Sequence, residues 1–488
     1  MTMCALAAGG KECKVNMKKI IKLICCMTML LCLGCSSKSH LDPDNPVTVR
    51  LWNYYTGKQM ESFNQLVDQF NTSIGKEKGI IVEVTSFGNV NELGQSVLDS
   101  ANKKVGAKEV PHIFAAYADT AYQVDKLDLV ENLKPYFSDK ELSEYIDGYI
   151  DEGMFDDELK IFPIAKSTEL MMINMTDFNK FSKATGAQLS DLSTLEGLTA
   201  TAKKYYEYTD QLTATPNDGK AFFGRDAMAN YIVVGLKQLG HDIIDIKDGK
   251  TVLDFDKQSV KKLWDNYYIP YVHGYFKAEG RFRSDDVKLG NIISFVGSSS
   301  GATFFPKQVI VSDEKSYPID VKVLEAPLFQ DAQKYAVQQG AGMVVTKSDD
   351  AHVEGSVEFL KWFTQKEQNI TFSIDSGYLP VTKEANQMKT IQETTKINSE
   401  LMKEVIEVSV DTVNNKKLYT TKAFDNGAKL RTQLENCLND KAKEDYENAQ
   451  KALKSGKSAD DVYSQYDSNE NFEDWYQTTY QKLKDIIG

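Results

Sequence analysis

Alternating apolar and polar side chains predict a β-strand over residues 47–52. Apolar residues at helical spacing follow between Met60 and Phe70, and a second strand is predicted over residues 80–84. Strand, helix and strand within about 40 residues form a βαβ unit, and such crossovers favour a mostly parallel sheet. Residues 111–117 are predicted to be a third strand, which ends shortly before polar side chains.

The rest of the chain continues this mixed pattern. Strands are predicted over residues 169–174, 291–296 and 341–345, and a capping box at residues 193–196 predicts the start of a helix. Another helix is predicted through residues 353–363, and the last hundred residues are mostly helical, polar and charged. A chain of 488 residues is longer than one hydrophobic core usually organises. The sequence therefore predicts an α/β protein of at least two lobes.

The N-terminal segment has the pattern of an export signal. A start with three lysines precedes a 12-residue apolar run from Leu23 to Gly34, whereas a membrane-spanning helix needs about 20 apolar residues. The run ends at Cys35 and a polar stretch, and this junction resembles the lipobox of bacterial lipoproteins, although Cys32 stands where that motif usually has leucine. We predict a signal peptide over residues 1–34, with Met17 as the true first residue. The resemblance implies lipidation of Cys35 and a tether over residues 35–46.

The cysteine distribution and the net charge exclude several classes of protein. Six of the seven cysteines lie in the first 35 residues, so Cys437 alone remains for the folded chain and cannot form a disulfide framework or a cysteine cluster. The net charge is −13, and cleavage before Cys35 would leave 52 basic against 69 acidic side chains, a net charge of −17. An acidic chain repels phosphate backbones, so we expect no nucleic-acid partner.

A small-residue turn over residues 297–301 matches G-x-S-x-G, the nucleophile elbow of α/β-hydrolases. An esterase using Ser299 would need a downstream histidine, and His352 is the only one after Ser299. The other interpretation is a strand-end turn that binds a polar ligand through hydroxyl and backbone N–H groups. The five histidines are widely spaced and no nucleotide-binding motif is present, so we expect no metal and no cofactor.

Aromatic and acidic side chains gather at two predicted strand ends. Trp52 and Tyr54 lie at the end of the first strand, and Tyr117 and Asp119 lie at the end of the third. Open α/β sheets bind ligands at the carboxyl ends of their strands, and sugar rings suit aromatic faces beside carboxylates. The alternative interpretation is that Trp52 belongs to the core and Tyr54 is ordinary amphipathic surface.

These features together resemble the extracellular solute-binding proteins of carbohydrate-type ABC importers, the family of maltose- and glycerol-phosphate-binding proteins. Residues 49–53 match the family's opening strand, and residues 162–165 followed by 171–178 are similar to its first lobe crossing. Residues 340–342 resemble the return crossing, and residues 376–381 resemble a late Gly-x-x-Pro signature. Met171 and Met172 stand where the family often has tyrosines, which puts aromatic contacts from that strand in doubt.

The resemblance implies a two-lobed periplasmic-binding-protein-like fold, with mostly parallel sheets flanked by helices and joined by a hinge. Lobe one is expected over residues 47–162 and 336–376, and lobe two over residues 163–335 and 377–488. Carried over by motif, the expected ligand contacts are Trp52, Tyr54, Tyr117, Asp119, Ser298, Ser299, Gly342 and Tyr378.

The ligand expected from these residues is a neutral saccharide. The glycerol-phosphate branch of the family has an arginine near the position of Asp425, and a carboxylate there would repel a phosphate dianion. Lys422 or Arg431 could still supply a positive charge.

The function implied by the resemblance is a monomeric binding subunit with no catalytic role. It would be anchored by lipid to the outer face of the bacterial cytoplasmic membrane and would deliver a sugar or oligosaccharide to an ABC permease. Two alternatives stay open: a serine esterase using Ser299, and a sensor subunit of the same fold that presents its ligand to a membrane kinase.

Overall fold

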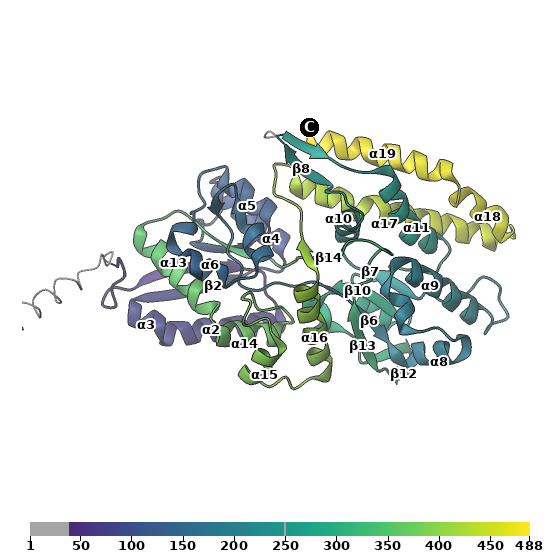
Figure 1. Ribbon diagram of the computed structural model, residues 1–488, viewed down its shortest axis with the longest axis horizontal. Coiled ribbons are helices and arrows are strands. Elements are labelled where there is room, and N and C mark those ends of the chain that lie inside the picture. The colour runs from purple at the N-terminus through teal and green to yellow at the C-terminus, as the bar shows by residue number, and fades with distance from the viewer. Residues whose placement is uncertain (1–38, 248–249) are drawn as a thin grey trace, which may run out of the picture.

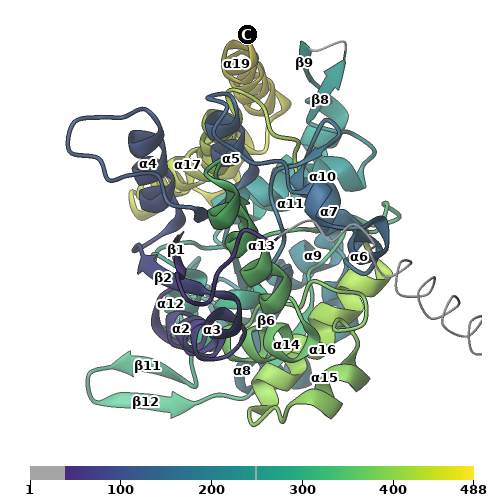
Figure 2. The same ribbon diagram turned by 90° about the vertical axis from the view of Figure 1, so that its left-hand side faces the viewer.

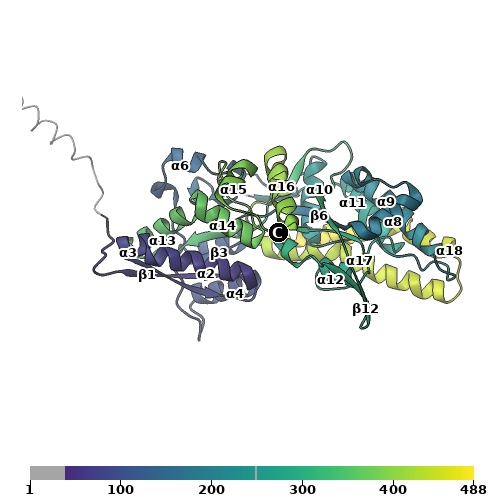
Figure 3. The same cartoon turned by 90° about the horizontal axis from the view of Figure 1, so that it is seen from below.

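The computed structural model describes residues 39–247 and 250–488, so the predicted signal peptide and Cys35 lie outside the described residues. The chain forms two lobes that lie side by side along the long axis (Figures 1 and 3). β14 (Tyr335–Val337) and α16 (Glu400–Asn415) lie between them in Figure 1. This arrangement confirms the predicted two-lobed α/β fold. No helix of the described segments is long and apolar enough to cross a membrane.

The first lobe is built on a four-stranded sheet in the order β15-β3-β1-β2. β1 pairs in parallel with β2 and with β3, whereas β15 is antiparallel to β3. Two of the three pairings are therefore parallel, as predicted. The strands are β1 (Val47–Asn53), β2 (Ile80–Ser86), β3 (Ile113–Ala116) and β15 (Gly342–Val345).

Aromatic rings hold the helices of the first lobe to this sheet. Phe63 and Phe70 are both fully buried and lie seven residues apart on one face of α2. Both rings pack against Phe359 of α13, and the centroids of Phe63 and Phe359 are 6.3 Å apart. The helices are α2 (Gly57–Thr72), α3 (Ile74–Lys78), α4 (Val90–Ala101), α5 (Ala118–Asp125), α6 (Asp139–Ser143), α7 (Asp147–Gly153), α13 (Asp350–Phe363) and α14 (Lys366–Ser376).

The second lobe has a four-stranded sheet in the order β13-β6-β10-β7, in which the pairing is mixed. β6 is antiparallel to both β13 and β10, and only β10 and β7 are parallel. The prediction of mostly parallel strands is therefore wrong for this sheet, because β6 enters it directly from the lobe crossing rather than through a helix. The strands are β6 (Glu169–Asn174), β7 (Phe223–Arg225), β10 (Ser294–Ser298) and β13 (Val321–Glu325).

The C-terminal helices complete the second lobe by packing on α11. Trp264 of α11 stacks on Tyr268 at 3.6 Å between ring centroids and meets Trp475 of α19 at 4.9 Å. The helices are α8 (Met175–Thr185), α9 (Leu195–Asp210), α10 (Met228–Gln238), α11 (Lys257–Val272), α12 (Arg283–Lys288), α16 (Glu400–Asn415), α17 (Gly427–Lys454), α18 (Ala459–Tyr466) and α19 (Asn469–Ile487), with α15 (Met388–Thr394) beside α16. Short 3₁₀ turns are η1 (Lys134–Tyr136), η2 (Leu189–Ser193) and η3 (Ser299–Phe304).

Four two-stranded sheets lie outside these layers. The β11–β12 hairpin stands out from the body of the molecule (Figure 2), and β14 pairs in parallel with β16 between the lobes. Their strands are β4 (Met154–Phe155), β5 (Glu158–Leu159), β8 (Ile244–Lys247), β9 (Lys250–Leu253), β11 (Gln308–Ser312), β12 (Lys315–Pro318), β14 (Tyr335–Val337) and β16 (Lys417–Tyr419).

Crossing segments near residues 162–168, 337–343 and 377–382 connect the lobes and hydrogen-bond to one another. The backbones of Ser167 and Gln339 exchange two hydrogen bonds of 2.9 Å, and those of Lys166 and Leu379 exchange bonds of 3.2 and 2.6 Å. These pairings are the structural core of the predicted hinge. The lobe boundaries given above stay predictions.

One local expectation differs in detail from the structure: the helix predicted from the capping box at residues 193–196 is capped by Thr194. α4 begins at Val90, where Asn89 caps it by accepting a hydrogen bond from the backbone of Glu92. Asp286 of α12 is fully buried and paired with Arg283.

Candidate functional site

The most informative surface lies where the two lobes meet. Tyr54 and Tyr117 follow the carboxyl ends of β1 and β3 in the first lobe. Two elements of the second lobe come close to this edge: η3, which follows β10, lies beside Tyr378, and the first residue of α17 contacts Asp119. We call this region, with the crossing residue Tyr378, the lobe junction.

Two tyrosine hydroxyls define the floor of the lobe junction. The hydroxyl oxygens of Tyr54 and Tyr378 lie 3.3 Å apart, and the backbone N–H of Ala341 donates to that of Tyr54 at 3.4 Å. Burial and the neighbouring phenol raise the pKa of Tyr54 well above its usual value, and burial likewise raises that of Tyr378. Both groups therefore stay neutral hydroxyls that can donate and accept hydrogen bonds.

The predicted small-residue turn forms the second wall. The hydroxyl of Ser298 lies 2.9 Å from that of Ser300 and donates to Ser167 at 3.2 Å. The side chain of Ser300 also lies beside the hydroxyl of Tyr378, so the row of hydroxyls runs from one lobe to the other. Ser299 points inward: its side chain is fully buried, and its Oγ has no hydrogen-bond partner among the described residues.

An acidic group of the first lobe meets the start of α17. The Asp119 carboxylate lies so close to Gly427 that a Cβ there would be 2.0 Å from Oδ1, and only glycine leaves room for this contact. Burial raises the pKa of Asp119 to about 6, and the nearby charge of Arg431 opposes the shift. Tyr117 also lies within the electrostatic influence of Arg431. It remains 38% exposed, so its ring is accessible at the lobe junction.

Asp425 is not a free negative charge. Its carboxylate lies 2.6 Å from the ammonium of Lys126, the residue after α5, and this ion pair joins the lobes. The repulsion of phosphate expected from Asp425 is therefore largely cancelled by this lysine. The arginine at the lobe junction is Arg431, one turn after Gly427, and Arg431 donates to Asn230 at 2.8 Å.

Two predicted contact residues lie away from the lobe junction surface. Trp52 is 4% exposed and packs against Phe87 at 5.3 Å between ring centroids, as the core interpretation predicted. Gly342 is buried in β15, where a Cβ would meet the side chain of Ile161 at 2.4 Å. Both residues support the site from beneath, whereas Tyr54, Tyr117, Asp119, Ser298 and Tyr378 gather at the lobe junction.

A buried polar network beside the lobe junction was not predicted from the sequence. Glu169 at the start of β6 pairs with Arg225 at the end of β7 and accepts a hydrogen bond of 2.9 Å from Asn230. Asn230 in turn accepts from Arg431, so the network reaches the lobe junction. These residues are separated by up to 262 positions in the sequence, and no local motif marks them.

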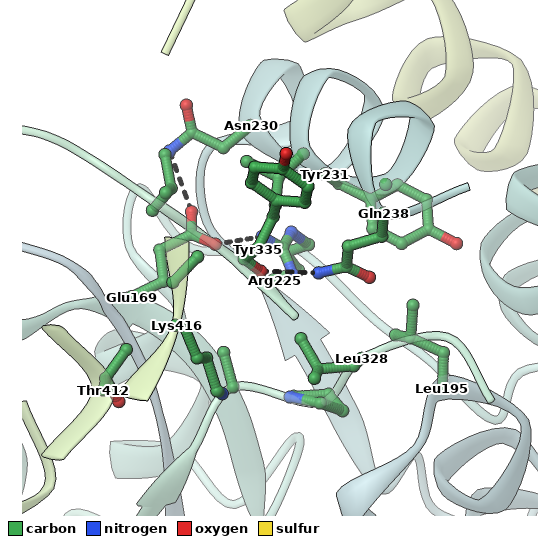
Figure 4. A pocket seen from close by; sticks show the side chains of 16 residues that line it. Glu169, Leu195, Arg225, Asn230, Tyr231, Gln238, Leu328, Tyr335, Thr412 and Lys416 are labelled. Atoms are coloured by element: carbon green, nitrogen blue, oxygen red, sulfur yellow. Dashed lines mark hydrogen bonds and ion pairs between the residues drawn. The ribbon is translucent and has the colours of Figure 1, made fainter. Parts of the chain in front are cut away.

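Residues of the same network line one side of a small cavity next to β14 (Figure 4). The cavity holds about 30 Å³, room for roughly two water molecules. Polar side chains of Glu169, Arg225, Gln238 and Lys416 line it together with apolar groups such as Leu328. The Nε atom of Arg225 is buried without a hydrogen-bond partner in the described chain, so water is the occupant that this lining suits.

A second buried ion pair lies in the crossing itself. Lys166 is 1% exposed, and its ammonium lies 2.6 Å from Glu152 of α7 and donates to the carbonyl of Gly340 at 2.8 Å. Gln338 of the second crossing also donates to Glu152. This cluster fixes both crossing segments to the first lobe.

The structure does not bring together the groups that an esterase needs. Ser299 hydrogen-bonds through its backbone N–H to Thr168, whereas His352 pairs with Asp349 at the start of α13 and stacks on His112 in the first lobe. The general base of a serine hydrolase must reach the nucleophile, and His352 is not placed to do so. The described residues also contain no group of three or more histidine, cysteine or acidic side chains that could hold a metal ion.

Fold and site together define a class of protein: a two-lobed binding protein whose polar and aromatic groups meet where the lobes join. A family model of bacterial extracellular solute-binding proteins matches residues 65–399. The chain belongs to this family. No curated protein sequence matches the chain significantly.

Solved structures share the fold over almost the whole chain. A cyclic alpha-maltosyl-1,6-maltose binding protein from Arthrobacter globiformis is 16% identical, with 91% of this chain and 99% of that chain covered and a TM-score of 0.65. The GacH receptor of Streptomyces glaucescens, solved unliganded and with acarbose, is 12% identical with coverage of 89% and 98% and a TM-score of 0.63. UgpB from Mycobacterium tuberculosis, in complex with glycerophosphocholine, is 15% identical with coverage of 90% and 99% and a TM-score of 0.60.

Proposed function

We propose that the protein is the solute-binding subunit of an ABC importer and captures a sugar or oligosaccharide at the lobe junction. The observation that carries this proposal is the gathering of Tyr54, Tyr117, Asp119, Ser298 and Tyr378 from both lobes and the crossing around one surface. Phenol rings offer apolar faces to sugar C–H groups, and hydroxyls and a carboxylate suit the sugar rim. The family and the folds of GacH and the cyclic maltosyl-maltose binding protein support this class of ligand.

Capture would proceed by rotation of one lobe against the other. A ligand that contacts both lobes binds the closed state more tightly than the open state and shifts the population toward it. The hydroxyl row from Tyr378 through Ser300 to Ser298 joins the lobes at the base of the lobe junction. A ligand replacing part of these contacts would keep the lobes together without any bond being made or broken.

The ligand would be a neutral saccharide rather than a strongly charged one. Asp119 and Arg431 carry opposite charges at the lobe junction and no direct ion pair joins them in the described structure. Sugar hydroxyls can donate to the carboxylate and accept from the guanidinium in the same bound state. A phosphate group would gain from Arg431 but lose from Asp119, so a zwitterionic ligand such as the one in UgpB is the second candidate.

The exported protein would be held at the membrane by a lipid on Cys35, which lies in the predicted lipobox. One acyl chain gives only reversible membrane binding, so durable anchoring needs at least two chains. The permease would recognise the closed, liganded state. The same fold can instead present its ligand to a sensor kinase. Identifying the membrane protein that co-purifies with the anchored subunit would distinguish a permease from a kinase.

A thermal-shift screen against a saccharide library tests the proposed ligand class. A ligand that binds only the folded state at 100 times its Kd stabilises it by about 2.7 kcal/mol, which raises the melting temperature measurably. Tyr117→Ala should weaken binding of the sugar found in the screen by tenfold or more, which corresponds to about 1.4 kcal/mol. Tyr136→Ala is the matched control, because Tyr136 is 37% exposed against 38% for Tyr117 and lies away from the lobe junction. Stabilisation by peptides or polyamines and by no sugar would contradict the proposal.

A further inference from the structure

The first described residues of the chain are bound to a helix of the first lobe. The hydroxyl of Ser39 donates to one carboxylate oxygen of Glu354 at 2.7 Å, and the backbone N–H of His40 donates to the other at 2.8 Å. The His40 ring lies 3.4 Å from the same carboxylate. Hydrogen bonds to an ionised acceptor are among the stronger ones in proteins. We call these three residues the tether clasp.

The tether clasp rests on parts of the lobe that cannot easily move. Glu354 belongs to α13, and the next residue, Gly355, packs against strands β1 and β2 so closely that a Cβ would lie 3.3 Å from Val49. Further along the tether, the backbone of Asp42 crosses Gly79, where a Cβ would be 2.1 Å from the Asp42 carbonyl oxygen. The start of the described chain is therefore held against the first lobe at Ser39, His40 and Asp42.

The position of the tether clasp affects how the molecule would be oriented relative to a membrane anchor. The described chain begins at the end of the long axis formed by α3 and α13, and α18 of the second lobe lies at the opposite end (Figures 1 and 3). An extended chain spans at most about 3.6 Å per residue. Ser39 lies four positions after Cys35, so an anchor at Cys35 reaches only about 14 Å beyond the tether clasp. Without the tether clasp, the 12 residues to Val47 would reach about 40 Å.

We propose that the tether clasp determines which end of the molecule stays at the lipid bilayer, so that the end formed by α3 and α13 is held near the membrane and α18 lies farther from it on average. The proposal rests on the proposed lipid anchor at Cys35. A short anchor at one end of an elongated molecule keeps that end close to the membrane surface and leaves the other end free to move away from it. A released tether lets either lobe approach the bilayer.

Energy transfer on vesicles tests this orientation. The chain from Cys35 onward is coupled through that cysteine to a maleimide lipid in phosphatidylcholine vesicles that contain an acceptor-labelled lipid. Cys437 is replaced by alanine, because it is a free, partly exposed thiol that would compete for the maleimide. A donor dye is placed through an azido amino acid either at Lys76 on α3 or at Gly456 after α17, both exposed.

The unchanged protein should show at least about twofold stronger quenching of the donor at Lys76 than of the donor at Gly456. Ser39→Ala with His40→Pro removes both hydrogen-bond donors of the tether clasp and leaves the lobes intact, and the ratio of quenching should fall toward one. Glu354→Ala should have the same effect. Glu358→Ala is the matched control, because Glu358 lies one turn further along α13 and pairs with Lys78 at 2.6 Å rather than with the tether; it should keep the ratio of the unchanged protein.

Equal quenching of the two donors in the unchanged protein would overturn the proposal, and so would an unaltered ratio in the tether variant. The chemical lipid makes this test independent of how the cell processes the chain. Mass spectrometry of the exported protein decides separately whether Cys35 carries a diacylglyceryl group. An unmodified Cys35 would remove the proposed anchor, whereas a lipidated Cys35 with equal quenching would remove only the proposed orientation.

Discussion

Replacing Lys166 by methionine takes a positive charge out of the crossing between the lobes while leaving most of the side-chain volume in place. The ammonium lies 2.6 Å from Glu152, whose side chain is 8% exposed, and 2.8 Å from the carbonyl oxygen of Gly340. The Lys166 side chain itself is 2% exposed. Water cannot take over either role of the lysine at this depth. Lys166→Met therefore leaves a buried carboxylate without a counter-charge.

Breaking one side of a buried ion pair typically costs about 3–5 kcal/mol, because the remaining charge stays desolvated and unpaired. We expect Lys166→Met to lower the free energy of unfolding by this amount. Lys166→Met with Glu152→Gln removes both charges, and the glutamine can still accept from Gln338. The double variant should recover most of the loss and lie within about 1–2 kcal/mol of the unchanged protein.

Urea unfolding followed by tryptophan fluorescence and by circular dichroism measures the loss, and coincident transitions justify a single free energy. Lys203→Met is the control, because Lys203 is 58% exposed and its pair with Glu207 spans 3.8 Å; it should change stability by less than about 0.5 kcal/mol. A loss below about 1 kcal/mol in Lys166→Met, or a double variant less stable than the single one, would refute the assignment of an uncompensated buried charge.

Four further changes test separate contacts. Gly427→Ala puts a methyl group where the Asp119 carboxylate lies 2.0 Å away, so the lobes should separate, which X-ray scattering shows as a larger radius of gyration, while helix stability is kept. Burial raises the pKa of Asp119 to about 6, so the folded state keeps a proton that the unfolded state releases near pH 4. The free energy of unfolding should therefore fall as the pH rises from about 4 to 6. Asp119→Asn should reduce this pH dependence in urea unfolding curves. Gly342→Ala meets Ile161 at 2.4 Å and should cost about 1–3 kcal/mol in urea unfolding. Ser299→Ala removes a buried hydroxyl without a described partner, so stability should stay the same or rise by up to about 1 kcal/mol; a loss above about 2 kcal/mol would show that the hydroxyl is bonded.

Local patterns predicted the first lobe better than the second. The alternation over residues 47–52 and the mostly apolar segment over residues 80–84 predicted β1 and β2, which α2 and α3 join and which are both partly buried. The mixed pairing of β6 could not be read in this way. Strand direction depends on where the crossing segment enters the second sheet, and no feature of residues 169–174 records it.

The site was predictable where it follows strand ends and not where it depends on charge partners. Tyr54 and Tyr117 come directly after apolar strands, so the rule for open α/β sheets placed them together. Asp425 appeared to be a free carboxylate because its partner, Lys126, is 299 residues away in the sequence. The contact of Asp119 with Gly427 spans a comparable distance, and only the packing of α5 on α17 shows why a glycine stands there.

The two buried ion pairs also locate the bend that lobe closure would require. Lys166 is fixed to the first lobe through Glu152, whereas Glu169, three residues later, is fixed to the second lobe through Arg225. A rotation that separated either pair would expose or unpair a buried charge, which costs several kcal/mol. The change in backbone angles along this crossing must therefore fall between the two pairs, at residues 167–168. These residues hydrogen-bond to the neighbouring crossing, to the backbone of Ser299 and to the hydroxyl of Ser298, so the bend can occur without breaking either ion pair.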